Sequence, residues 1–147
     1  QFVCGDVKDI RCYYSSGDYT LVTANPPYRL PTSGRISPVE AVARARHETT
    51  AGLQDFVNAA AFLLRNRGRF AMIHLPERLA DICNALRSVG LEPKRLRFVH
   101  PFADRAAKMV LVEAVKGVKP GLTVLSPLTI YQAPGQYNPE ILSYYSG

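Results

Sequence analysis

Four consecutive residues, Asn25-Pro26-Pro27-Tyr28, have the types and the order to hold a planar ring that carries an amino group. Neither proline has a backbone N–H, and each restricts the residue before it to extended conformations, so the chain leaves any sheet at Asn25. The Asn25 side chain and the Asn25 and Pro26 carbonyls are acceptors, and Tyr28 adds a flat ring. Because an exocyclic amino group has two N–H donors, this arrangement favours a nucleic-acid base.

The residues before this motif must place it at the end of a strand. Residues 19–24 form a short apolar, β-branched run, which predicts a buried parallel strand whose carboxyl end opens into a site. Residues 1–7 predict the end of another strand and a turn at Gly5, with Asp6 at the carboxyl edge. There Asp6 could accept from a ligand amine, or it could form a turn or cap a helix.

The elements after the motif follow the order loop, helix, strand, helix, strand, strand. The predicted ranges are an exposed loop at 29–38, a short helix at 39–46, helices at about 51–66 and 77–89 ended by Gly68 and Gly90, and strands at 69–75, 94–99 and 109–115. The short link between the last two strands leaves no room for a helical crossover, so the pair should be antiparallel. Residues 117–147 are rich in Pro, Gly and Tyr, with short extended pieces at 122–125 and 128–131 and a helical turn at 139–145.

Composition bounds the class of protein. At 147 residues, 47% hydrophobic and 20% charged, the chain predicts one globular domain without disorder. The longest apolar runs are far shorter than a membrane span, which favours a soluble, cytoplasmic protein. Cys4, Cys12 and Cys83 lack C-x-x-C spacing, so neither a disulfide framework nor a metal site is predicted. The net charge of +6, carried mostly by arginine, makes nucleic acid a candidate partner.

The motif resembles the fourth motif of S-adenosylmethionine-dependent methyltransferases that act on amino or amide nitrogen. Several later stretches are similar to the bacterial tRNA adenine-N6-methyltransferase family, whose characterised members methylate the adenine just 3′ of the anticodon in a valine tRNA. These stretches are Ala45-Arg46-His47-Glu48, Gly68-Arg69-Phe70, Arg97-Phe98-Val99-His100-Pro101, residues 108–113 and residues 126–131. The resemblance covers nearly the whole chain from Gly5 onward.

This resemblance implies a Rossmann-like class I methyltransferase fold, an α/β sheet whose parallel strands end in an antiparallel pair. The family's glycine-rich loop and its acidic residue after the second strand have no counterpart here, so residues 1–147 are expected to be the C-terminal part of that domain, from near the end of the third strand, without the N-terminal cofactor half. Residues 117–147 would be the tail of the same domain. Residues 1–6 should then lack neighbours, and the strand at 19–24 should have a bare edge prone to self-association.

The resemblance also implies the roles of individual residues. Asn25, Pro26, Pro27 and Tyr28 would be catalytic, and Asp6, Val7 and Asn25 would remain of the S-adenosyl-L-methionine site. Transfer would proceed by base flipping and in-line displacement at the methyl carbon, and this chain alone is expected to be inactive. The candidates for holding the backbone of RNA, with tRNA as the expected class, are Arg29, Arg35, Arg44, Arg46, His47, Arg105 and Lys108.

Other interpretations stay open from the sequence. Each basic residue could be a solvated surface charge, and His47 and His100 could be structural, while His74, inside a predicted strand, is expected to serve packing. The tail tyrosines are expected to pack on the sheet. As a whole, the chain could instead be a protein-glutamine N5-methyltransferase, which shares the four-residue motif, or a non-catalytic RNA-binding domain.

Overall fold

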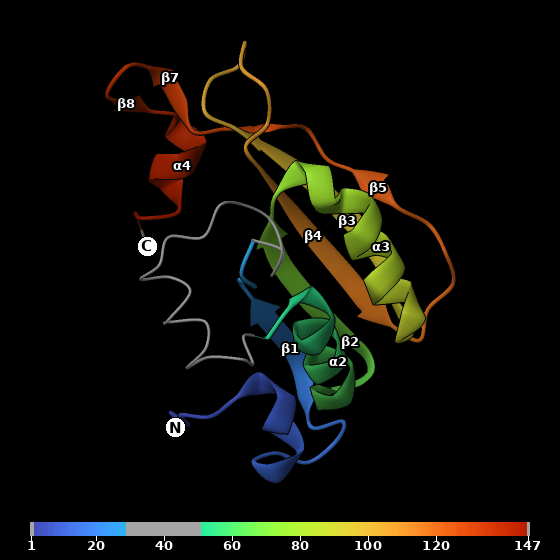
Figure 1. The fold of residues 1–147 in the computed structure, drawn as a ribbon. Helices are drawn as coiled ribbons and strands as arrows, with labels where there is room; N and C mark the ends of the chain where they lie inside the picture. Colours follow the sequence, from blue (N-terminus) through green and yellow to red (C-terminus); the bar gives the residue numbers. More distant parts are fainter. Residues whose placement is uncertain (1, 29–50, 147) are drawn as a thin grey trace, which may run out of the picture.

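The computed structural model describes residues 2–28 and 51–146. Its main feature is a six-stranded mixed sheet in which five strands follow the order β1-β2-β4-β3-β5, and β6 also pairs with β3 (Figure 1). The strands are β1 (Tyr19–Ala24), β2 (Leu64–His74), β3 (Leu91–His100), β4 (Met109–Lys116), β5 (Thr123–Val124) and β6 (Leu128–Thr129). The predicted loop at 29–38 and short helix at 39–46 lie outside the described residues.

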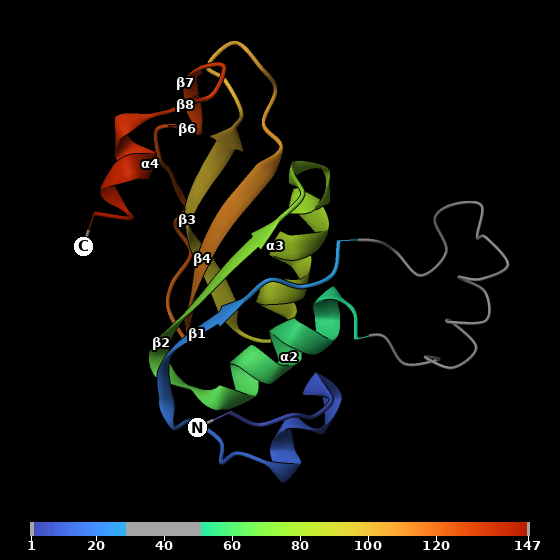
Figure 2. The same ribbon diagram turned by 90° about the vertical axis from the view of Figure 1, so that its left-hand side faces the viewer.

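The strand directions determine which segments meet at one edge of the sheet. β1 is parallel to β2, and β4 is antiparallel to both β2 and β3. The carboxyl ends of β1, β2 and β3 therefore point the same way, as Figure 2 shows. The motif after β1, the end of β2 and the loop after β3 all lie at this edge. In α/β proteins this is where ligands bind.

Two helices, α2 (Leu53–Leu63) and α3 (Leu79–Ser88), cover one face of the sheet (Figures 1 and 2). At the start of α2, the backbone N–H of Gly52 donates to Asp55 Oδ2 over 2.9 Å, which satisfies one group that a helix start leaves free. α3 follows the short helix η2 (Pro76–Arg78) and ends before Gly90, whose φ of 76° is the left-handed conformation typical of a helix terminator.

The core lies between these helices and the sheet. Along β2, alternate side chains face the helices, and Phe70, Met72 and His74 are all buried there. The opposite alternate positions, Ala71 and Ile73, are only partly buried. The fully buried side chains of this core include Val57, Leu64, Phe70, Ile82, Leu86, Leu91 and Val110. This packing fixes the end of β2 against the helix layer.

The chain's last segment covers part of the other face. It contains a small hairpin, β7 (Tyr131–Ala133) with β8 (Gln136–Tyr137), and α4 (Pro139–Ser143). Figure 2 shows α4 on the side of the sheet away from α2 and α3. Ile141 packs with Val99 and Leu128 in a second apolar cluster. Arg97 on β3 forms a bidentate pair with Glu140 over 2.6 and 2.8 Å, which attaches α4 to the sheet.

Most predicted elements are confirmed, and four details are wrong. The strand end predicted within residues 1–7 is absent, because residues 2–6 form no strand. β1 is parallel to β2 as predicted but is not buried: it pairs only with β2 among the described strands, and four of its six residues are exposed. The helix predicted to 66 ends at Leu63, and Gly68 does not terminate it, because β2 begins directly at Leu64. Gly68 instead lies inside β2, where an added Cβ would approach Arg65 O and Leu64 Cδ2 to 2.9 Å. Its role is therefore close packing. Of the tail tyrosines expected to pack on the sheet, Tyr131 and Tyr137 stack on each other, with ring centroids 5.0 Å apart.

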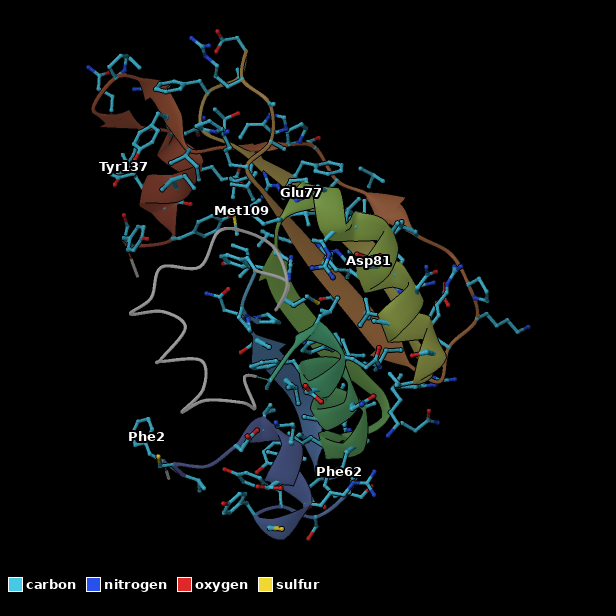
Figure 3. All side chains as sticks on the ribbon, in the orientation of Figure 1. Phe2, Phe62, Glu77, Asp81, Met109 and Tyr137 are labelled. Carbon is cyan, nitrogen blue, oxygen red and sulfur yellow. The ribbon has the colours of Figure 1, made fainter. Side chains whose placement is uncertain are left out.

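The first residues lack strand neighbours, as expected. Residues 2–6 form no strand, Phe2 is fully exposed, and the chain then enters η1 (Val7–Cys12), which packs on α2 (Figure 3). Within the described residues, β1 pairs only with β2, so its other edge is bare. No helix in the described parts of the chain is long and apolar enough to cross a membrane.

Candidate active site

The four-residue motif follows β1 directly and has no regular secondary structure. Asn25 is exposed, Pro26 is fully buried, and Tyr28 is half-buried. The Tyr28 hydroxyl donates to Asn25 Oδ1 over 2.5 Å, so the two side chains close across the prolines. The structure therefore brings together the amide and the aromatic ring that the sequence singles out.

The four-residue motif leaves acceptor capacity at the Asn25 side chain. An amide oxygen has two lone-pair positions, and the Tyr28 hydroxyl occupies one. Because Asn25 is exposed, a ligand N–H can approach the remaining position. A hydrogen bond from Tyr28 also orients the amide, which would otherwise rotate freely at the surface.

A cavity of about 330 Å³ adjoins Asn25 on the helix side of β1. Val7 and Asn25, two of the three residues predicted to contact the cofactor, both line it. Its other walls come from β1, α2 and η1 and are mostly apolar. The volume and lining match a site for a flat heterocycle of moderate size, such as an adenine ring.

The third predicted cofactor contact, Asp6, has a structural role here. Its Oδ1 accepts from the Lys8 backbone N–H over 2.9 Å and caps η1, and its Oδ2 lies 3.6 Å from Lys8 Nζ. Asp6 is not among the residues that line the cavity beside Asn25. Helix capping is one of the two interpretations that the sequence leaves open for Asp6.

His74, expected from the sequence to serve packing, also contacts the four-residue motif. Its side chain is fully buried at the end of β2, and its ring lies edge to face with Tyr28, with centroids 5.3 Å apart and an interplanar angle of 75°. The Leu75 backbone N–H donates to His74 Nδ1 over 2.8 Å. Burial, and then the Arg78 charge, lower the pKa of His74, so the imidazole is neutral at neutral pH.

The loop after β3 places basic residues at the same edge of the sheet. Arg105 and Lys108 lie in this loop and are exposed. Arg105 pairs only loosely with Asp104, at 3.7 Å, and its backbone carbonyl lies 2.6 Å from His100 Nδ1. His100 thus fixes the loop. The other predicted RNA contacts, Arg29, Arg35, Arg44, Arg46 and His47, lie outside the described residues.

The described residues contain no cluster typical of a metal site. Among residues 2–28 and 51–146, no three His, Cys, Asp or Glu side chains lie close enough to share an ion. The three cysteines are free thiols, with Cys4 and Cys12 exposed. Polar groups at the carboxyl edge include the Asn25 amide and the Tyr28 hydroxyl, with Glu77 after β2 and Asp104, Arg105 and Lys108 in the loop after β3.

Sequence comparison finds relatives with a common assigned activity. A protein of Porphyromonas gingivalis named tRNA1(Val) (adenine(37)-N6)-methyltransferase is 30% identical over 144 residues, which covers 92% of this chain and 54% of the relative. A protein of the same name from Trichodesmium erythraeum is 28% identical over 125 residues, covering 85% of this chain and 51% of that protein. The chain thus spans about half the length of the curated relatives it matches. No protein-family model matches the sequence.

Solved structures share the fold at low sequence identity. A protein from Agrobacterium tumefaciens, described as a predicted O-methyltransferase, superposes with a TM-score of 0.72 at 21% identity, covering 94% of this chain and 58% of that one. A candidate DNA modification methylase from Thermus thermophilus, in complex with S-adenosyl-L-methionine, gives a TM-score of 0.53 at 16% identity, covering 97% and 62%. The chain therefore has a Rossmann-like class I methyltransferase fold and is a homologue, over about half of their length, of the curated tRNA1(Val) (adenine(37)-N6)-methyltransferases.

Proposed function

We propose that this chain carries the target-base half of an S-adenosyl-L-methionine-dependent methyltransferase that modifies N6 of adenine in RNA, with tRNA as the substrate class. The observation that carries the proposal is the Asn25–Tyr28 pair, an oriented amide oxygen beside an aromatic ring at the carboxyl edge of the sheet. The names of the curated relatives support the choice of adenine and of tRNA.

The chemistry explains why an amide oxygen is needed. The adenine amino nitrogen is a weak nucleophile because its lone pair is delocalised into the ring. Asn25 Oδ1 would accept one N–H, and the Pro26 carbonyl would accept the second once entry of the base uncovers it, since Pro26 is fully buried in the described structure. With both N–H groups accepted, the nitrogen becomes more pyramidal and its lone pair points away from the ring plane. Methyl transfer is then an in-line displacement: an N–C bond forms, the sulfonium S–C bond breaks, and one amino proton is subsequently lost to solvent.

The base must leave its stack to reach this site. Flipping is cheaper from a single-stranded loop than from a duplex, which favours a loop of a folded RNA. Tyr28 would stack on the flipped base, and such stacking is worth about 1–3 kcal/mol. Arg105 and Lys108 would contact the RNA backbone, together with the predicted Arg29, Arg35, Arg44, Arg46 and His47.

The cofactor would lie on the other side of Asn25. Val7 and Asn25 line the cavity of about 330 Å³ beside β1, and this position would hold the adenine end of S-adenosyl-L-methionine. Bound there, the cofactor would supply an electrophilic methyl group. The described residues supply only two of the three predicted cofactor contacts, so we expect the 147-residue chain alone to be inactive. We also expect the bare edge of β1 to allow self-association.

Calorimetry tests the enzymatic class. S-adenosyl-L-methionine should bind a protein extended at the N-terminus to the length of the curated relatives, while the 147-residue chain should give no measurable heat. Failure of the extended protein to bind the cofactor would overturn the proposal and favour a non-catalytic RNA-binding domain. Labelled methyl transfer to a glutamine peptide, with none to bulk tRNA, would instead identify a protein-glutamine methyltransferase.

A further inference from the structure

The protonation of His74 follows from its contacts. Nδ1 accepts a hydrogen bond from the Leu75 N–H over 2.8 Å, so this nitrogen carries no proton. A neutral imidazole must then carry its proton on Nε2. The lowered pKa, caused first by burial and then by Arg78, keeps the ring in this neutral form.

The Nε2–H group of His74 is therefore a buried donor. Nε2 has no hydrogen-bond partner among residues 2–28 and 51–146, and the side chain is fully buried. Buried donors are nearly always paired, and those that are not call for an explanation. The aromatic neighbour is Tyr28, whose ring meets the imidazole edge to face.

The electrostatics of two aromatic rings suit this arrangement. The face of a phenol ring is negative and the edge of an imidazole that carries an N–H is positive. An N–H directed at a ring face recovers part of a conventional hydrogen bond. A centroid separation of 5.3 Å at 75° lies within the range of such contacts.

We propose that His74 is a positioning residue of the candidate active site, with its Nε2–H directed at one face of Tyr28, so that the Tyr28 hydroxyl stays on Asn25 Oδ1. Three contacts then follow one another: the Leu75 N–H donates to His74, the His74 ring contacts the Tyr28 ring, and the Tyr28 hydroxyl donates to Asn25. Together they connect the rigid end of β2 to the exposed amide after β1. A flipped base would then stack on the other face of Tyr28.

The consequence for rate rests on the proposed function, whereas the contact itself does not. His74→Phe keeps an aromatic ring and removes the N–H, and His74→Gln can return an N–H near the Nε2 position without the ring. In the N-terminally extended protein, His74→Phe should lower kcat for tRNA about 3- to 10-fold, the equivalent of one hydrogen bond, with KM changed less than about 2-fold. His74→Gln should recover at least half of the lost rate.

Two controls separate positioning from general destabilisation. Phe70→Leu changes a fully buried side chain on the same face of β2 and should leave kcat within about 2-fold while lowering the melting temperature. In a Tyr28→Leu background the aromatic acceptor is absent, so His74→Phe should change the rate by less than about 2-fold. If the effects of His74→Phe and Tyr28→Leu multiply, or if His74→Phe retains full activity, the proposal is overturned.

A spectroscopic measurement decides the contact without any activity. In the 147-residue chain, ¹⁵N NMR should show His74 as the Nε2–H tautomer, and ring current from Tyr28 should shift this proton upfield. The shift should disappear in Tyr28→Leu and persist in Phe70→Leu. An Nδ1–H tautomer, or a proton shift unaffected by Tyr28→Leu, would overturn the proposal. If the contact is confirmed but the extended protein methylates no RNA, the proposed function fails and the His74–Tyr28 contact stands.

Discussion

The Tyr28 hydroxyl donates to Asn25 Oδ1 across the two prolines, at 2.5 Å. This hydrogen bond orients an exposed amide and still leaves one lone-pair position for a ligand. The two prolines keep the four residues out of the sheet. His74, at the end of β2, contacts the Tyr28 ring edge to face. The candidate site is therefore preorganised by its own sequence neighbours and by one adjacent strand.

Replacing the amide should remove the central acceptor. Asn25→Ala in the N-terminally extended protein should lower kcat by on the order of 10²-fold or more, as loss of one preorganised polar contact does elsewhere. Because Asn25 is exposed, the melting temperature should stay unchanged. Asn58→Ala, at an exposed asparagine on α2, is the matched control. Initial rates of methyl transfer to tRNA measure the effect, and full activity of Asn25→Ala would exclude this role.

The two parts of Tyr28 should contribute separately. Tyr28→Phe removes only the hydroxyl and should lower kcat about 2- to 10-fold, which corresponds to one hydrogen bond. Tyr28→Leu also removes the stacking surface and should cost a further ~1–3 kcal/mol of transition-state stabilisation. Steady-state kinetics with the same tRNA compare the two variants. Equal rates for Phe and Leu at this position would contradict a stacking role.

The loop after β3 should supply electrostatic affinity for RNA. Arg105→Ala with Lys108→Ala should weaken tRNA binding and reduce the slope of log K against log salt by about 1–2, since each contact displaces about one counterion. Lys119→Ala is the control, because this exposed lysine follows β4 and lies at the opposite edge of the sheet. Filter binding between about 50 and 200 mM salt gives both slopes. An unchanged slope in the double variant would argue against RNA contact by this loop.

Attachment of α4 should depend on pH through Glu140. The Arg97 guanidinium, and then the Tyr144 hydroxyl, lower the pKa of Glu140 to about 2 from its ordinary 4.5. A carboxyl whose pKa is lower in the folded state stabilises that state above pH 4.5, and the stabilisation is lost as pH falls toward 2. The protection factors of the backbone amides in residues 139–143, each corrected for the intrinsic exchange rate at that pH, should therefore fall over this window. Glu140→Gln should remove this pH dependence, and Asp104→Asn should leave it unchanged. A pH dependence that persists in Glu140→Gln would contradict the role of Glu140.

The core should respond to truncation far more than the N-terminal segment does. Phe70 is fully buried and Phe2 is fully exposed, so the same substitution compares the two environments. Phe70→Ala should lower the free energy of unfolding by about 3–5 kcal/mol, and Phe2→Ala should change it by less than about 0.5 kcal/mol. Urea denaturation followed by circular dichroism measures both values. Similar values for the two variants would place the core elsewhere.

The order of elements could be predicted because their local signals are strong. The short link between 99 and 109 required an antiparallel pair, and β3 and β4 form one. The end of α2 was harder to predict, because β2 follows α2 directly without a loop. The apolar Leu64 fits the hydrophobic periodicity of a helix as well as that of a strand, and Gly68 is the nearest conventional helix terminator. Leu64 is fully buried and pairs with Tyr19 of β1, and neither contact can be predicted from the local sequence.

The site could be predicted only in part for a similar reason. The two prolines predict that Asn25 and Tyr28 lie at the end of a strand. They do not predict the hydrogen bond between the two side chains. His74 could not be recognised because its position beside Tyr28 depends on the register of β1 against β2, in which Ala24 lies opposite Met72. The signal that the sequence carries is a histidine at the end of a predicted strand, two residues before Pro76.

The identity of the methylated atom shows whether the site at Asn25 acts on the amino group of adenine. The N-terminally extended protein is incubated with unmodified tRNA and methyl-labelled S-adenosyl-L-methionine, and the RNA is digested to nucleosides for mass spectrometry. We expect label in N6-methyladenosine, reduced about 10²-fold or more by Asn25→Ala. Label in another nucleoside, or an Asn25→Ala protein as active as the parent, would contradict an amide oxygen that holds an adenine amino group at the end of β1.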